Sequence, residues 1–77
     1  MKLSEVEQEI YNAALDAFKD YYTGDKIEYE HEYGYYLGLQ RMAFLNKELT
    51  PERAKRIFDH AEMLMRRKYQ KKEEGRR

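Results

Sequence analysis

Three helix-start signals divide the chain into segments of similar length, and this punctuation constrains the fold more than any other feature. Ser4 and Glu7 have the spacing of a capping box, in which each side chain accepts a hydrogen bond from the backbone amide of the other residue. Asp25 can cap a second segment. Thr50 followed by Pro51 begins a third segment, because proline at the first helical position loses no hydrogen bond. The sequence therefore predicts three helices.

Apolar residues recur at three- and four-residue steps in the first and third segments, which is the spacing of an amphipathic helix. Gly24 is the residue best suited to the left-handed end of the first helix. We expect helices at about 5–22, 26–46 and 51–70. Gly34 and Gly38 each cost the second helix about 1 kcal/mol relative to Ala, so a break at Gly34 is the alternative to a continuous helix.

Short links between these helices predict an all-α, up-down-up three-helix bundle, with one domain over residues 1–77. Helices 1 and 3 are then parallel. The charged stretch 71–77 has nothing apolar to bury, so we expect a frayed, flexible tail there. The expected core comprises Val6, Ile10, Ala14, Phe18, Leu37, Leu45, Ala54, Ile57, Phe58, Ala61, Leu64 and Met65.

Composition narrows the class of protein further. A chain of 77 residues is too small to hold a deep substrate cavity inside its own core. The absence of cysteine excludes disulfides and thiolate metal sites. No apolar run approaches the roughly 18 residues of a membrane span, and no signal peptide is recognisable at the start. A cytoplasmic location is therefore the expectation.

The sequence contains no complete catalytic or metal-binding motif. Ser4, the only serine, and Thr50 both serve as helix caps. Glu28 and His31 form a single Glu-x-x-His, whereas carboxylate-bridged di-iron bundles need two copies and two further glutamates. No glycine-rich phosphate loop follows a strand. We expect no enzyme activity, no catalytic residues, no metal, no cofactor and no small-molecule substrate.

Charge is unevenly distributed along a chain whose formal net charge is zero. Residues 1–32 carry nine acids and three lysines, and residues 33–77 carry twelve bases and six acids. The favoured interpretation is ion pairing inside the bundle, with Glu5, Glu7 and Glu9 level with Arg53, Lys55 and Arg56. The end of helix 3 would likewise lie beside an acidic corner between helices 1 and 2, formed by Asp16, Asp20, Asp25, Glu28, Glu30 and Glu32.

The alternative is a nucleic-acid interface on helix 3. Its residues would be Arg53, Arg56, Arg66, Arg67, Lys68, Lys71 and Lys72. A helix-turn-helix unit formed by helices 2 and 3 fits poorly, because both helices exceed the usual length and the joining turn lacks glycine.

Aromatic residues exceed what a small core needs. Eight Tyr and three Phe make up 14% of the chain, and many of them lie on helix 2. The hypothesis is an exposed protein-binding face made of Tyr29, Tyr33, Tyr35, Tyr36, Leu39 and Phe44. Alternatively, these rings cover the chain's own core. Gly34 and Gly38 lie one turn apart and would admit a close helix, either a partner or helix 1 or 3 of the same chain.

These features together predict a small non-catalytic module that binds another protein or a second copy of itself. A short, charge-rich helical chain of this kind resembles the accessory, regulatory or inhibitor proteins of bacteria, phages and mobile elements. Nucleic-acid binding is the less favoured function, and no membrane association is expected.

Overall fold

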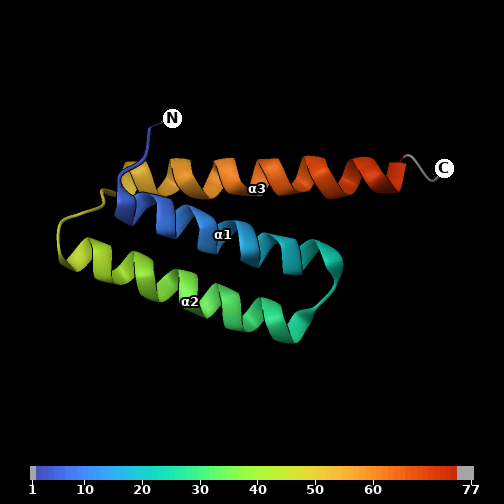
Figure 1. Ribbon diagram of the computed structural model, residues 1–77, viewed down its shortest axis with the longest axis horizontal. Coiled ribbons are helices and arrows are strands. Elements are labelled where there is room, and N and C mark those ends of the chain that lie inside the picture. The colour runs from blue at the N-terminus through green and yellow to red at the C-terminus, as the bar shows by residue number, and fades with distance from the viewer. Residues whose placement is uncertain (1, 75–77) are drawn as a thin grey trace.

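The computed structural model describes the backbone of residues 2–74 and the side chains of residues 2–69. It contains three helices, α1 (Glu5–Thr23), α2 (Lys26–Leu45) and α3 (Pro51–Glu74), and no strand within the described range. The chain runs up α1, down α2 and up α3, so that α1 and α3 are parallel (Figure 1). The predicted all-α three-helix bundle is confirmed.

Each helix begins at the residue that the sequence indicates. The Glu7 amide donates to Ser4 Oγ at 3.2 Å, and the Ser4 amide donates to Glu7 Oε1 at 3.0 Å, which completes the capping box. The side chains of Asp25 and Thr50 accept backbone amides three residues ahead at 3.1 and 3.2 Å. Gly24 ends α1 in the left-handed conformation, with φ of 84°. Local capping chemistry therefore fixes the helix boundaries.

Two boundaries refine the sequence-based expectation. α2 continues through Gly34 without a break and ends at Leu45, one residue before the predicted end. α3 continues to Glu74, whereas the sequence placed its end near residue 70. The last part of the predicted tail, residues 75–77, lies outside the described residues, and its flexibility stays a prediction.

α1 is the central helix of the bundle. It packs against both α2 and α3, while α2 and α3 meet each other only sparsely (Figure 1). Ala13, Ala14 and Ala17 of α1 are buried, and their small side chains allow helices to approach closely on two sides. The buried core consists of Ile10, Ala13, Ala14, Ala17, Tyr36, Ala43, Leu49, Ala54, Ile57 and Ala61.

Nine of the twelve predicted core residues are buried or half-buried, and the prediction is wrong for three leucines. Ile10, Ala14, Ala54, Ile57 and Ala61 are buried, and Val6, Phe18, Phe58 and Met65 are half-buried. Leu37, Leu45 and Leu64 are instead 44%, 73% and 44% exposed. α2 turns the side that carries Tyr36 and Ala43 toward the core, so Leu45 lies on the opposite side. Leu64 lies beside the narrow stripe that α3 buries against α1.

Candidate protein-interaction surface

Three of the four tyrosines of α2, Tyr29, Tyr33 and Tyr36, form a row of neighbouring rings. Tyr29 and Tyr33 have ring centroids 5.5 Å apart, and Tyr33 and Tyr36 have centroids 6.0 Å apart. The ring centroids of Tyr36 and of Phe58 on α3 are 6.1 Å apart, and Tyr36 is only 3% exposed. Burial raises the pKa of Tyr36 to about 12 and also raises the pKa of Tyr29, because the phenolate would be poorly solvated there.

The six residues of the aromatic face that the sequence predicted differ widely in their exposure. Tyr36 is a core residue, so its predicted exposure is wrong. Tyr29, Tyr33, Leu39 and Phe44 are half-buried, and the last three pack against the core. Only Tyr35, which is 59% exposed, points away from the bundle. The interpretation that these side chains cover the chain's own core therefore applies to Tyr33, Tyr36, Leu39 and Phe44, which are four of the six residues.

A different set of residues forms the exposed apolar surface of α2. Ile27, Met42 and Leu45 are 74%, 62% and 73% exposed, and Tyr35 adjoins them. We define the outer face of α2 as Ile27, Gly34, Tyr35, Gly38, Met42 and Leu45. Positions 27, 34, 38 and 45 are separated by steps that correspond to about two turns, one turn and two turns of helix. They form a single line along α2.

Gly34 and Gly38 lie at the middle of the outer face and are open to solvent. A Cβ atom built on either glycine would meet no atom within 4 Å. Neither α1 nor α3 therefore packs closely against these two glycines. The alternative that the glycines serve packing within the same chain is wrong. Packing within the bundle thus does not require glycine at either position of α2.

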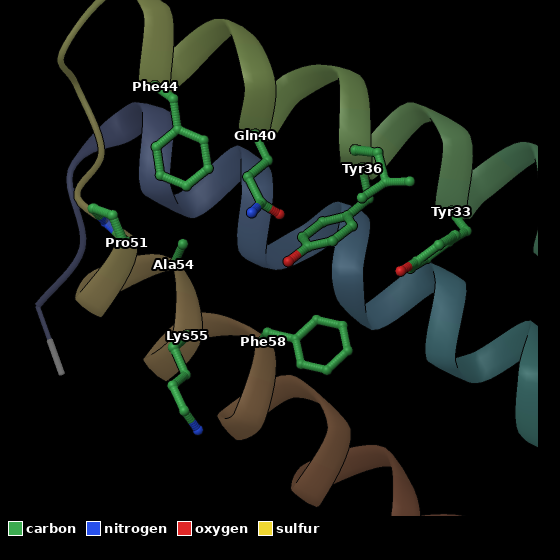
Figure 2. A pocket seen from close by; sticks show the side chains of 9 residues that line it. Tyr33, Tyr36, Gln40, Phe44, Pro51, Ala54, Lys55 and Phe58 are labelled. Atoms are coloured by element: carbon green, nitrogen blue, oxygen red, sulfur yellow. The ribbon is translucent and has the colours of Figure 1, made fainter.

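A shallow groove separates α2 from α3 (Figure 2). Figure 2 shows Tyr33, Tyr36 and Phe44 entering it from α2 and Phe58 from α3, whereas Lys55 lies at its rim and extends away from α2. The groove results from the sparse contact between these two helices. Its lining is aromatic and aliphatic apart from Gln40, Lys55 and the tyrosine hydroxyls. These groups supply no pairing of a nucleophile with a base.

Ion pairing between α1 and α3 is concentrated at one end of the bundle. Arg53 Nε donates to Glu7 Oε2 at 2.6 Å, and Arg53 Nη2 donates to Glu7 Oε1 at 2.9 Å. These hydrogen bonds, together with the Ser4 amide, lower the pKa of Glu7 to about 2 from its ordinary 4.5. The predicted pairing of this end is confirmed for Glu7 and Arg53.

The opposite end of α3 pairs differently from the prediction. Arg66 lies 3.6 Å from Glu62 of its own helix, and Tyr22 of α1 donates its hydroxyl to the same carboxylate at 2.9 Å. Among the described side chains, Arg66, Arg67 and Lys68 form no ion pair with the acidic corner between α1 and α2. The corner lies on the far side of α1 from α3 (Figure 1), which explains the difference.

The other residues of the alternative nucleic-acid interface are scattered along α3. Arg56, Arg67 and Lys68 are exposed, and Arg53 is occupied by Glu7. The side chains of Lys71 and Lys72 lie outside the described part of the chain. Among the described side chains, the cations of this interface therefore fall into two groups, Arg53 with Arg56 and Arg66 with Arg67 and Lys68, about ten residues apart.

The histidines lie on different helices. His31 is exposed on α2, and His60 Nδ1 of α3 lies 2.9 Å from the Tyr11 hydroxyl. Within the described residues, no group of three or more His, Asp or Glu could hold a metal ion. Nor does any helix in that range combine the length and apolar character of a membrane span.

Comparison of the chain with family models, with curated proteins and with solved structures yields no match. The functional argument therefore rests on the surface itself. Sequence reasoning missed Ile27 and Met42 and assigned Leu45 to the core. The available signal was that apolar residues occur on every side of α2, so that burying any one side leaves apolar residues on another.

Proposed function

We propose that this protein is a non-catalytic interaction module of the cytoplasm that binds another protein chain through the outer face of α2. The observation that carries the proposal is the exposure of Ile27 and Leu45 in one line with two open glycines, with the exposed Met42 beside that line. Isolated exposed apolar residues are common, whereas several on one side of a helix favour an interaction site, here with the exposed polar residues Glu30, His31 and Arg41 among them. An accessory, regulatory or inhibitor role, including one in a phage or mobile element, agrees with such a surface.

A helix is the partner element that this surface fits best. Gly34 and Gly38 lack side chains for about one turn of α2, so another backbone can approach closely there. Ile27 and Leu45 would then cover the approaching helix on both sides of the glycines. Tyr35, the one exposed member of the original aromatic set, adds rigid amphipathic contact area at the edge.

The experiment is affinity capture with a matched pair of double variants. Met42→Ser with Leu45→Ser removes two side chains of the outer face, and neither side chain is buried in the bundle. We expect a bound protein, including a differently tagged copy of the chain, to be reduced at least about tenfold, because the lost apolar area is worth more than about 1.4 kcal/mol.

The control is Met63→Ser with Leu64→Ser, which changes the same two residue types at exposed positions of α3. This variant should retain the partner. Equal loss from both variants, or full retention by the α2 variant, would contradict an interaction through the outer face. Circular dichroism of both proteins establishes that each is folded.

Nucleic-acid binding by α3 is the second candidate, because Arg66, Arg67 and Lys68 are not neutralised by the acidic corner. Against it, Glu62 pairs with Arg66, and Asp59 lies close to Lys55 on the same helix. Phosphate binding that depends on a few cations is weak at physiological salt.

We therefore expect no measurable binding of generic duplex DNA near physiological salt by fluorescence anisotropy. Micromolar binding that weakens steeply as salt increases, and that Arg67→Gln reduces, would instead favour the α3 interface. Such a slope reports release of counterions from neutralised phosphates.

A further inference from the structure

The outer face of α2 has an internal symmetry that indicates its occupant. Ile27 and Leu45 lie at equal distances from residue 36, and so do Gly34 and Gly38. An antiparallel copy of α2, related by a two-fold axis perpendicular to the helix beside residue 36, would place Ile27 against Leu45 of the second copy. It would also place the open glycines of the two copies together. The order of bulky and small residues along this face is therefore the same when the face is read in the opposite direction.

Charge follows the same symmetry. Glu30 and Arg41 are both exposed, and eleven residues, about three helical turns, separate them, so they lie on one side of the outer face. They also lie at nearly equal distances from residue 36. In the antiparallel pair, Arg41 meets Glu30 of the second copy, and the symmetry makes this contact twice. Among the described side chains, neither residue forms an ion pair within its own chain.

A parallel pair lacks this match. It would place Glu30 against Glu30 and Arg41 against Arg41, and like charges in contact disfavour association. More generally, Glu28, Glu30 and Glu32 lie in the first third of α2, and its lysines and arginines are Lys26 at the first position and Arg41 near the end. The helix dipoles also oppose each other favourably only in the antiparallel arrangement.

We propose that the outer face of α2 binds a second copy of this chain, antiparallel across Gly34 and Gly38, to form a two-fold symmetric dimer. This inference rests on the proposed function and names the partner of the same surface. The interface is isologous, because each copy contributes the same residues. Tyr35 of each copy lies near the axis on one edge, and Leu37 of each copy lies near it on the other edge.

Charge reversal tests both the partner and the orientation by sedimentation equilibrium over increasing concentration. Arg41→Glu places glutamates against Glu30 of the other copy at both contacts, and we expect the dimer dissociation constant to rise about tenfold. Adding Glu30→Arg to this variant restores opposite charges across the antiparallel interface, and we expect a value within about threefold of the parent chain. The two positions are too far apart along α2 for an intramolecular rescue.

A glycine variant separates association from folding. Gln at position 38 favours the helix relative to Gly, and the site is open, so Gly38→Gln should not lower the unfolding midpoint of dilute protein. Its side chain would nevertheless hold the two backbones apart. We expect the dimer dissociation constant to rise at least about tenfold, since close packing at the centre of the interface is lost.

Cross-linking tests the register, because the chain contains no cysteine. With a short bis-maleimide reagent, Leu37→Cys should form covalent dimers quickly. The two copies of residue 37 are offset by only about 3 Å in the direction of the helix axes. Leu45→Cys should react slowly, since its copies lie about 27 Å apart. Equal or faster cross-linking of Leu45→Cys would overturn the antiparallel arrangement.

Failure of this inference can be distinguished from failure of the proposed function. A chain that remains monomeric into the high micromolar range overturns the dimer. If that monomer still captures a different protein, and Met42→Ser with Leu45→Ser abolishes the capture, the proposed function stands with another partner. If neither association occurs, both proposals are wrong.

Discussion

Tyr36→Ala is expected to lower the free energy of unfolding by about 3 kcal/mol or more, as large-to-small aromatic substitutions in cores do. Tyr36 is 3% exposed, and its ring is in contact with those of Tyr33 and Phe58. It is also the largest residue that α2 buries fully, since the other is Ala43. A chain of this length has a total stability on the order of 4 to 12 kcal/mol. The loss should therefore be a large fraction of the total stability and should clearly lower the urea midpoint of unfolding.

The neighbouring tyrosine supplies the matched control. Tyr35 is 59% exposed, so Tyr35→Ala should change the stability of dilute protein by no more than about 0.5 kcal/mol. Urea unfolding followed by circular dichroism measures both variants. Tyr36→Phe retains the ring and should stay close to the parent protein. Similar losses for Tyr35→Ala and Tyr36→Ala would contradict the inward orientation of Tyr36.

The fold could be predicted from the sequence because its determinants are local. Ser4, Asp25 and Thr50 each satisfy a helix start through atoms within three residues, and Gly24 ends α1 without help from a distant contact. Apolar spacing then identifies the buried sides of α1 and α3, where one side of each helix is clearly more apolar. Local signals of this kind do not depend on the tertiary arrangement.

The orientation of α2 could not be predicted in the same way. Its apolar residues surround the helix, so either Tyr36 and Ala43 or Leu37 and Leu45 could have faced the core. The choice is made by packing: α1 presents small buried alanines, and the large ring of Tyr36 can occupy the space beside them and reach Phe58. The interaction surface is the side that remains, so the site could not be identified before the packing was known.

Glu7 should be the most stabilising charged residue of the bundle. Its carboxylate accepts both guanidinium hydrogen bonds of Arg53 and the amide of Ser4, while only 7% of the residue is exposed. Glu7→Gln keeps an acceptor for the amide but loses the charge that Arg53 requires. We expect the free energy of unfolding at neutral pH to fall by about 2 kcal/mol, which is typical of hydrogen bonds to charged groups. Urea unfolding measures this change.

The pH dependence of that loss identifies its cause. The pKa of Glu7 in the folded protein is about 2, below the ordinary 4.5, so folding favours the ionised carboxylate. The stabilisation is therefore complete above pH 4.5 and is lost as the pH falls toward about 2. Accordingly, the difference between parent and Glu7→Gln should shrink over this interval. Glu9→Gln changes an exposed position of the same helix and should leave the free energy of unfolding close to that of the parent protein. An effect equal to that of Glu7→Gln would mean that the contact with Arg53 is not the cause of the loss.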